Sequence, residues 1–430
     1  MHNKTRFQYW IIIVAIIFVA LPNFSKAQTS ISSPYSRFGI GETNVFNNAI
    51  NNAMGGVGYA YRRNNSINYM NPASYAGIDT TSFVFDVGYY TEWITLSNNQ
   101  YKSSGNKAGL SHLLVGFPIG NKFKFALGLI PMSSVEFSTS ETIIDTVLGK
   151  HTKSYESLGG LNKALLGISF APIKNLSIGV NLEYVFGNYY KSSTIAFPDS
   201  TYMYSSRVEN NYHVNAFNFN LGLQYFQPLS NGDKIGIGVV YDLPSKFPTD
   251  NVLSRYTFTT NAGLEYMKDS IHKENSSNSI KYPSTIGLGL SYEKPNKLFI
   301  GIDGRYMTWS DFKFQSNYQN TYFLNNFKVS LGGEWRPDIY GNYFQKSIYR
   351  FGVFYDNGML EFNNNNNRIN EMGVSFGIGL PIKKSNTMIN LSFEYLNKGT
   401  KENNLIEEDY FRIGLSFSAK DLWFFKRKYQ

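Results

Sequence analysis

The sequence predicts an all-β protein: a transmembrane up-and-down antiparallel β-barrel of about 14 strands with an N-terminal luminal plug. Three observations carry this prediction. The 430 residues are rich in aromatic side chains, with 34 Phe and 32 Tyr, while only 17% are charged. Segments of about ten residues alternate apolar with small or polar side chains. Short connections alternate with long ones, as in barrels whose turns and loops lie on opposite sides of a membrane.

The composition excludes several classes of protein. The absence of cysteine rules out disulfide frameworks, cysteine nucleophiles and an acylated N-terminal cysteine. The low charge and high aromatic content together argue against a disordered chain. The net charge is +9, and no basic residues cluster in the manner of a nucleic-acid interface. We therefore expect no nucleic-acid partner.

Residues 1–27 have the pattern of a secretory signal peptide. Lys4 and Arg6 form a basic start, residues 11–21 form an apolar run, and small residues surround a cleavage site after Ala27. The alternative is a membrane anchor, but the run is much shorter than the ~20 apolar residues that a spanning helix needs. We therefore expect an exported protein of the outer membrane of a Gram-negative bacterium.

Residues 82–430 are expected to form the barrel. In the segment from Leu176 to Tyr184 every second residue is large and apolar, so one face of a strand there is apolar. A water-soluble barrel would turn this face inward. The export signal, the strand number and the unequal connections favour an outward apolar face in contact with outer-membrane lipid. The strands are expected to start near Ser82, Ala108, Phe123, Leu161, Leu176, Tyr212, Lys234, Pro283, Leu298, Asn325, Ile348, Ile369, Asn386 and Tyr410.

The connections indicate which end of the barrel faces which compartment. Residues 120–122 and 172–175 are short connections, whereas residues 138–160, 188–211 and 244–282 are long. The short ones are expected to be periplasmic turns and the long ones extracellular loops. Aromatic residues near strand ends predict interfacial girdles. Their expected members are Tyr89, Tyr90, Trp93, Tyr184, Tyr189, Tyr190, Tyr306, Trp309, Trp335, Tyr355 and Tyr395.

Residues 28–81 lack clean alternation and are rich in Gly, Asn, Ser and Ala. A polar segment of this kind, only ~50 residues long, does not build a core of its own. It is either a periplasmic linker or a plug inside the barrel. A plug is favoured, because about eight strands is the limit at which wall side chains alone fill a barrel. Small residues let such a segment approach the wall closely, and glycine permits turns with positive φ.

The chain shows little sign of catalytic or metal chemistry. No two histidines have the spacing of metal ligands, so neither a metal nor another cofactor is expected. Ser111 and His112 are neighbours and suggest a hydrolase, but adjacent residues of a strand point to opposite faces, which would keep the two side chains apart. We therefore expect no enzyme and no catalytic residue.

Charged residues occupy the expected inner face of the barrel. An ion-paired wall that anchors the plug is the simpler interpretation, since unpaired charges away from bulk water are costly. The alternative is a path that guides a ligand. Asp303 and Arg305 share one face of one strand and are expected to pair. The candidate luminal charges are Glu183, Asp303, Arg305, Arg350, Glu371 and Arg412.

Pro131 lies in the middle of the third expected strand. Proline has no amide hydrogen for the strand ladder and is normally confined to edges and bulges. A closed barrel has no edge, so we expect a bulge or kink at this residue. The simpler alternative is a silent bulge near the outer interface.

Several motifs resemble the FadL/TodX family of outer-membrane hydrocarbon transporters. These motifs are residues 53–56, residues 71–73 just before the first strand, residues 283–292, and Tyr306 with residues 309–310. The resemblance implies a fourteen-stranded barrel with a plug shaped by Gly55, Gly56, Asn71, Pro72 and Ala73. It also implies passive uptake of a hydrophobic ligand such as a long-chain fatty acid, which would leave through a lateral opening at Pro131.

The two ends of the mature chain differ from that family's usual pattern and resemble Bacteroidetes-type barrels, at residues 33–38 and 423–429. Members of this broad family in that lineage include non-transporting subunits of secretion machinery. The alternative function is therefore an accessory barrel in an outer-membrane secretion or assembly complex, with other subunits as partners. A transporter would contain an apolar cavity and a gap in the wall. An accessory barrel would have a polar, filled lumen.

Overall fold

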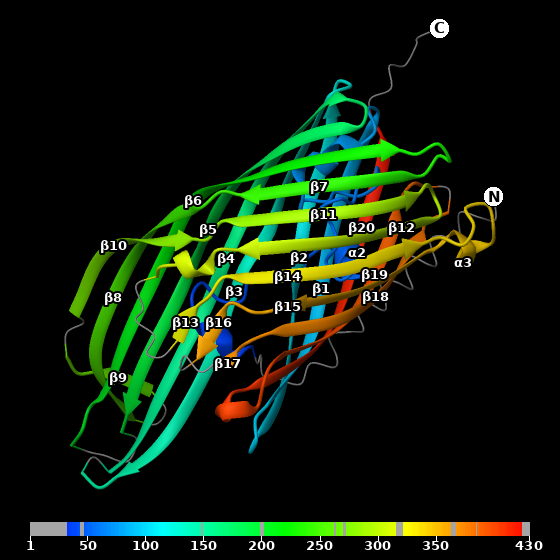
Figure 1. Ribbon diagram of the computed structural model, residues 1–430. Helices are drawn as coiled ribbons and strands as arrows, with labels where there is room; N and C mark the ends of the chain where they lie inside the picture. The colour runs from blue at the N-terminus through cyan, green and yellow to red at the C-terminus, as the bar shows by residue number, and fades with distance from the viewer. Residues whose placement is uncertain are drawn as a thin grey trace, which may run out of the picture. The chain divides into compact units, whose positions relative to one another are not determined.

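The structure is a computed structural model that describes residues 32–43, 47–147, 149–197, 202–261, 264–269, 272–314, 321–362, 367–383 and 385–423 (Figure 1). These residues belong to one compact unit, 31–430. The expected signal peptide, residues 1–27, lies outside the described residues.

Within the residues that the structure describes, six short helices interrupt an otherwise β-rich chain. Three belong to the leading segment, which we define as the described residues between 32 and 81. The other three lie in connections between strands. They are η2 (Pro34–Arg37), α2 (Ala49–Asn52), η3 (Pro72–Gly77), η4 (Trp309–Asp311), α3 (Tyr343–Lys346) and η5 (Glu402–Asn404). Within the described residues, no helix is both long enough and apolar enough to cross a membrane.

The strands follow one another mostly as antiparallel neighbours. The first ten are β1 (Ser82–Ser97), β2 (Lys102–Ile119), β3 (Phe123–Asp145), β4 (Gly149–Ile173), β5 (Leu176–Ala196), β6 (Ser205–Pro228), β7 (Lys234–Asp242), β8 (Ser245–Asn261), β9 (Leu264–Met267) and β10 (His272–Tyr282). The rest are β11 (Thr285–Lys294), β12 (Leu298–Met307), β13 (Thr321–Phe323), β14 (Asn326–Trp335), β15 (Ile348–Asp356), β16 (Leu360–Phe362), β17 (Asn367–Arg368), β18 (Glu371–Pro381), β19 (Met388–Gly399) and β20 (Glu407–Leu422).

One sheet of 17 strands closes on itself, because β1 pairs with β20 along its whole length. β7 and β8 occupy one position in the wall, since both pair with β6, and β10 and β11 likewise share the next position. β9 is a hairpin arm that pairs with β8 beyond the wall. The wall is therefore a closed antiparallel barrel of 14 strands, which confirms the predicted fold class. A separate small sheet contains β13, β16 and β17.

The outer surface of the barrel is apolar. In β11, Ile286, Leu288 and Leu290 are exposed, while Thr285 and Ser291 in the same strand are buried. An apolar band on the outside of a closed barrel is what a bilayer requires, since lipid offers no hydrogen bonds to an open sheet edge. The faces therefore have the predicted orientation, with the apolar side chains outward.

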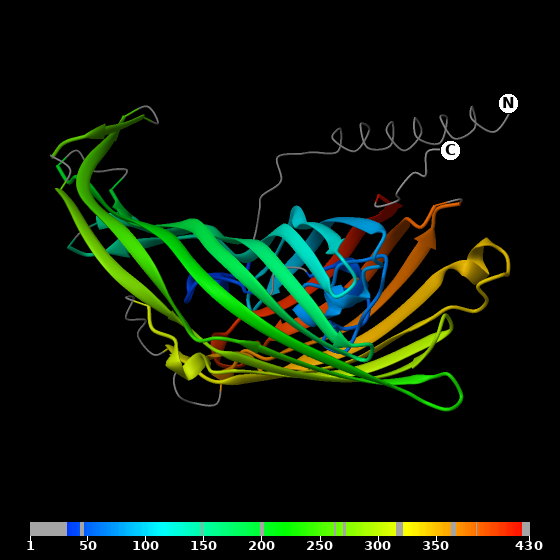
Figure 2. The same ribbon diagram turned by 90° about the horizontal axis from the view of Figure 1, so that it is seen from above.

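The long connections were predicted to be loops, but in the structure they are largely strand. β3 and β4 pair beyond the expected strand end as far as Asp145 and Gly149, and β5 and β6 pair as far as Ile195 and Ser206. Figures 1 and 2 show these strands, with β8 and β10, rising far beyond the rest of the wall on one side. We call this part the tall sheet. The apolar alternation of the barrel wall does not continue through its residues, so the sequence pattern did not mark them as strand.

The aromatic girdle prediction is wrong for some of its members. Trp93 and Tyr184 are exposed on the outer surface, but Tyr90, Tyr189 and Trp309 are buried inside the barrel. Strand parity explains Tyr90, because it neighbours the outward Tyr89 and so points to the opposite face.

Candidate functional site

The interior of the barrel is occupied by the leading segment, drawn in blue in Figure 2. Its backbone touches the wall where the wall carries glycine. A Cβ atom on Gly352 would lie 2.0 Å from the amide nitrogen of Gly55, and one on Gly238 would lie 2.0 Å from the carbonyl oxygen of Tyr59. β-Carbons do not approach other atoms so closely, so these glycines are needed for the fit. The segment and the wall therefore match each other at the level of the backbone.

The motif from Asn71 to Ala73 attaches the leading segment to one side of the wall. The Asn71 side chain accepts a hydrogen bond from the Ala73 amide (3.0 Å) and so caps η3, where Pro72 occupies the first turn. The same side chain donates to the carbonyl oxygens of Tyr59 (2.8 Å) and of Leu223 in β6 (3.2 Å). One asparagine thus joins a helix, a loop and the wall.

Gly55 and Gly56 form a turn after α2. Their φ angles are +67° and +90°, in the left-handed region that favours glycine. The Gly55 amide donates to the hydroxyl of Ser375 in β18 (2.9 Å). The turn therefore brings the leading segment against the β14, β15 and β18 side of the wall, opposite the attachment at Asn71.

Asp303 and Arg305 were predicted to pair with each other, but they do not. The Asp303 carboxylate accepts hydrogen bonds from the amides of Gly58 (2.7 Å) and Tyr59 (2.9 Å). Arg305 instead reaches Asp356 in β15, at 3.1 Å. Asp356 accepts hydrogen bonds at its other oxygen, Oδ1, from the amide of Gly358 (2.8 Å) and the side chain of Asn326 (2.9 Å), so both of its oxygens have partners.

Other predicted luminal charges also make specific contacts with neighbours in the wall. Glu183 pairs with Lys163 in β4 at 2.7 Å. Arg350 is almost fully buried and pairs with Glu334 at 3.2 Å. Such pairs compensate charges that the wall holds away from bulk water.

Arg412 is the centre of a network towards the tall end of the lumen. It contacts Glu92 at 2.8 Å, Glu394 at 3.1 Å and, from the leading segment, Glu42 at 3.7 Å. Lys398 lies 3.5 Å from the same Glu42. Glu371 lies opposite Lys398 in the strand register. The network therefore fixes the start of the leading segment to three strands of the wall.

The seam between β2 and β3 is short. The two strands pair only between Ile119/Phe123 and Leu113/Leu129; beyond this level β2 pairs with β1, and β3 pairs with β4. In this space Glu42 pairs with Ser134 of β3 through two backbone hydrogen bonds, of 2.9 and 3.1 Å. The leading segment therefore supplies backbone partners where the neighbouring strand is missing.

Pro131 lies two residues beyond the last residue of β3 that pairs with β2. On its other side it stays paired with Asn162 of β4, and the register shifts between Pro131 and Ser133 as in a β-bulge. The structure thus places the proline at the level where the β2–β3 seam ends. A lateral opening there stays a prediction.

Ser111 and His112 contradict the argument from strand parity. The pairing with β1 shifts between Gly88 and Tyr89, so that Ser111 is the extra residue of a β-bulge. Both side chains are buried, with Ser111 Oγ 2.9 Å from His112 Nδ1 and His112 Nε2 3.2 Å from Asp86 Oδ1. The three side chains form a hydrogen-bonded chain from serine through histidine to aspartate. Each of them is almost fully buried, so a substrate could not reach the serine hydroxyl.

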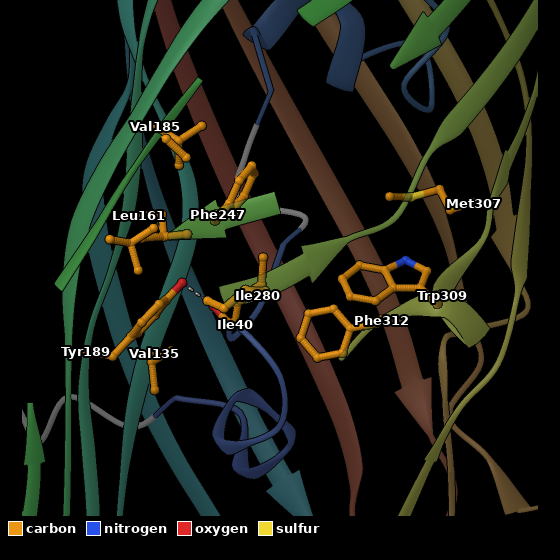
Figure 3. Close-up of a cluster of buried hydrophobic side chains, with 12 residues drawn as sticks. Ile40, Val135, Leu161, Val185, Tyr189, Phe247, Ile280, Met307, Trp309 and Phe312 are labelled. Atoms are coloured by element: carbon orange, nitrogen blue, oxygen red, sulfur yellow. Dashed lines mark hydrogen bonds between the residues drawn. The ribbon is translucent and has the colours of Figure 1, made fainter. Parts of the chain in front are cut away.

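Apolar side chains fill the lumen at the level where the tall sheet begins. They come from opposite sides of the barrel and point toward one another, with Ile40 of the leading segment among them (Figure 3). The Tyr189 hydroxyl donates to the Ile40 carbonyl oxygen at 2.8 Å. The buried members are Ile40, Val135, Leu161, Val185, Tyr189, Val214, Ala216, Phe247, Ile280, Met307, Trp309 and Phe312.

A cavity of about 760 Å³ lies at the other end, among the short turns. Its lining includes Arg62 and Arg63 of the leading segment together with Glu293, Glu334 and Arg336 of the wall and its turns. Burial lowers the pKa of Arg336, which follows β14. Two smaller cavities, of about 60 and 30 Å³, lie further along the lumen. The sizeable space thus opens on the short-turn end and has a polar, charged lining.

Sequence reasoning missed three parts of this site. Glu42 lies in a segment without periodicity, and the Ser111 bulge leaves no trace in alternation. The adjacent Arg62 and Arg63 were the one available signal, a pair of charges in a segment otherwise poor in them. Among the described residues, no group of three or more His, Cys, Asp or Glu side chains is arranged to hold a metal ion.

Comparisons with known proteins agree with this architecture. A protein-family model described as BamG matches residues 9–430. No curated protein matches the chain. The toluene transporter TodX of Pseudomonas putida is similar in structure, with a TM-score of 0.57, 15% identity, and coverage of 90% of this chain and 100% of TodX.

Two further solved structures are similar to the chain. The monoaromatic hydrocarbon channel CymD has a TM-score of 0.56 and 15% identity, with 88% of this chain and 99% of CymD covered. A FadL homologue of Pseudomonas aeruginosa has a TM-score of 0.54 and 14% identity, with 88% and 98% covered. The chain therefore has the FadL/TodX fold, as its motifs predicted.

Proposed function

The chain belongs to the BamG family, and we propose that its barrel is a closed, non-transporting subunit of a larger assembly in the outer membrane of a Gram-negative bacterium. The observation that carries this proposal is the filled lumen. Residues 28–81 then act as a plug, shaped by Gly55, Gly56 and the motif Asn71–Ala73. In this role the luminal charges hold the plug and do not guide a ligand.

The plug is held from the short turns to the tall end. Met54 and Tyr61 pack with Phe299 near the short turns, Tyr75 and Leu114 belong to a second buried cluster, and the cluster of Figure 3 fills the tall end. An uptake channel needs an apolar passage from the loops into the barrel. Here the corresponding volume is taken by side chains.

The tall sheet supplies a surface for a partner. At the tip of the β3–β4 hairpin, Ile144 and Val147 are 83% and 82% exposed, and Leu264 and Tyr266 in the arm of β9 are also exposed. These residues lie beyond the membrane wall, so lipid does not cover them. Large apolar side chains that gather on an exposed surface mark interaction sites.

Two measurements test this proposal. We expect the tagged full-length protein to co-purify from native membranes, in mild detergent, with other subunits in one large species. We also expect no steady conductance in planar bilayers and no solute-driven swelling of liposomes. Stable channel currents together with a monodisperse single-chain species would contradict the proposal.

A variant and its matched control test whether the exposed apolar residues of the tall sheet contact the partner. Replacing Ile144 and Val147 by serine should release the partner, because the apolar contact is lost. Tyr340→Ser is the matched control, since Tyr340 is equally exposed (87%) but lies in the short-turn connection after β14. Loss of the assembly with the control and not with the double variant would place the contact elsewhere.

A second candidate function is uptake of a hydrophobic molecule, for example a long-chain fatty acid. The observation that favours it is the short β2–β3 seam beside Pro131, in a fold shared with proteins described as hydrocarbon channels. Displacement of Glu42 from Ser134 would open that seam to the bilayer. Uptake would then be passive and would need the start of the leading segment to move.

The absence of cysteine allows a clean test of this second candidate. Glu42 and Ser134 exchange both backbone hydrogen bonds, a geometry in which Cα atoms are about 5.5 Å apart, a separation within the range of disulfide-linked cysteines. If the seam conducts, the variant Glu42→Cys/Ser134→Cys should take up toluene or oleate only when reduced. Equal uptake in the oxidised and reduced states would exclude the seam as the route.

A further inference from the structure

The cavity at the short-turn end carries a large excess of positive charge. Its lining contains eight arginine and lysine side chains against two glutamates. Arg63 pairs with both glutamates, Glu293 (2.7 Å) and Glu334, and Arg350 also contacts Glu334. The acidic residues of the lining are therefore already neutralised from within the cavity. The remaining cations are Arg62, Lys174, Lys234, Lys294, Lys297 and Arg336.

These six cations have no carboxylate within ion-pair distance among the residues that the structure describes. Arg62 instead donates to the side chains of Gln224 (3.0 Å) and Ser177, and its guanidinium lies 4.5 Å from the centre of the Phe226 ring. The Nε atom of Arg336 is buried and has no hydrogen-bond partner. A buried donor without an acceptor is costly, and an anion in the cavity would supply the acceptor.

We propose that this cavity, which we call the basic vestibule, binds an acidic peptide segment of a periplasmic partner protein. This inference rests on the proposed function and names the class of segment that the closed barrel receives at its periplasmic mouth. Short turns face the periplasm in barrels of this kind. The volume of about 760 Å³ lies in the usual range of ligand pockets, far above the size of a single ion.

The lining favours a peptide over other anions. Tyr61, Phe226 and Leu298 lie among the charged groups, so the vestibule offers apolar contact as well as cations. Inorganic phosphate has no apolar groups that could contact those side chains. A bound lipid headgroup would have to stay attached to acyl chains in the bilayer. Glu334, Arg350 and Asn390 of the cavity lining belong to the buried, inward face of the wall, away from the bilayer. A chain with carboxylates and apolar side chains fits both features.

Binding of a fluorescent hexapeptide of alternating Glu and Leu to the purified full-length protein in detergent tests this proposal. The affinity should fall steeply as salt rises from low to physiological ionic strength, because the contact is between charges. The same peptide with Gln in place of Glu should not bind measurably. Because no other subunit is present, this result does not depend on whether the assembly of the proposed function exists.

The variant Lys297→Gln/Arg336→Gln should weaken peptide binding about tenfold or more, since it removes two cations from the vestibule. The matched control is Lys122→Gln/Lys383→Gln, which removes two exposed cations from other short turns and should change the affinity less than about twofold. Equal losses for both double variants would overturn the proposal, since they would show only an attraction to net charge.

Competition experiments with two other anions distinguish a peptide site from a phosphate site or a lipid-headgroup site. Inorganic phosphate and micelles of lysophosphatidylglycerol should displace the labelled peptide only at concentrations far above that of the unlabelled peptide. Displacement by phosphate at comparable concentration would show a simple anion site, and displacement by the lipid would show a headgroup site. Either result would overturn the assignment to a peptide. Because wild-type protein is used, the outcome does not depend on how the variants fold.

Discussion

The two edges of β3 are closed in different ways. Toward β4 the pairing is continuous from Phe123/Phe170 to Asp145/Gly149, apart from one bulge. Toward β2 the pairing stops at Leu113/Leu129, and the leading segment takes over at Glu42 and Ser134. The β4 edge of β3 is thus closed by a continuous ladder of hydrogen bonds to the neighbouring strand. Beyond the end of the β2 pairing, the other edge has a single bridge to Glu42, whose side chain is held by the charge network. We therefore expect the barrel to resist opening less at the β2–β3 edge than at the β3–β4 edge.

The largest effect on this difference should come from Arg412→Ala. Arg412 contacts Glu92 and Glu394, and Glu42 at a longer distance, so its loss leaves three carboxylates without their shared cation. We expect a loss of about 3–5 kcal/mol in the free energy of unfolding, as for other buried pairs that lose one partner. Urea unfolding in detergent, followed by gel mobility of the folded barrel, measures it.

The control for this variant is Lys401→Ala. Lys401 pairs with Glu407 at 2.9 Å on the exposed surface, where water screens the charges, so its removal should leave the free energy of unfolding nearly unchanged. If both variants lost the same stability, the charge network would not hold the leading segment.

A smaller effect is expected from Gly352→Ala in β15, which lies three strands away from Arg412 in β20. The new methyl group would meet the backbone of Gly55 at 2.0 Å, so the leading segment must shift. We expect a loss of about 1–3 kcal/mol in the free energy of unfolding, as in other overpacked interiors. Gly304→Ala is the control, because a Cβ atom there meets nothing within 4 Å. An equal change for both would mean that the close approach at Gly55 does not matter.

Hydrogen exchange compares the two edges directly without any substitution. The amides of Glu42 and Ser134 form an isolated bridge, whereas the amide of Leu166 lies within the long β3–β4 ladder. We expect the bridge amides to exchange at least about tenfold faster, because a single bridge opens locally. Equal protection would show that the seam is as firmly closed as the ladder.

The smallest effect is expected from Pro131→Ala. Pro131 already lies next to a bulge and beyond the end of the β2–β3 pairing, so no ladder depends on its missing amide. The change should alter the free energy of unfolding by less than about 1 kcal/mol. A larger stabilisation, with faster pairing of β2 to β3, would instead identify the proline as the cause of the short seam.

Strand positions were predictable where a short turn precedes them. The expected starts at Phe123, Leu176 and Leu298 coincide with those of β3, β5 and β12. The starts expected at Leu161 and Tyr212 are wrong, because β4 and β6 begin earlier, in the tall sheet. Inside the bilayer, lipid imposes apolar alternation on every strand. Outside it that constraint ends, and the pattern with it.

The candidate site was less predictable, because it depends on contacts between distant segments. Parity identified Asp303 and Arg305 as inward residues, but not that backbone amides of the leading segment would satisfy Asp303. A single bulge reversed the expectation for Ser111. Neither a register shift nor a partner without periodicity is encoded in local residue patterns.

The enclosure of the leading segment has a consequence for biogenesis. The segment precedes β1 in the chain, contacts the wall on opposite sides, and is surrounded once β1 pairs with β20. The close backbone approach at wall glycines such as Gly352 and Gly238 would hinder the insertion of a folded segment after closure. We therefore expect the two ends of the nascent sheet to join around a leading segment that is already in place, and a chain without this segment to stall as an open, unsealed intermediate.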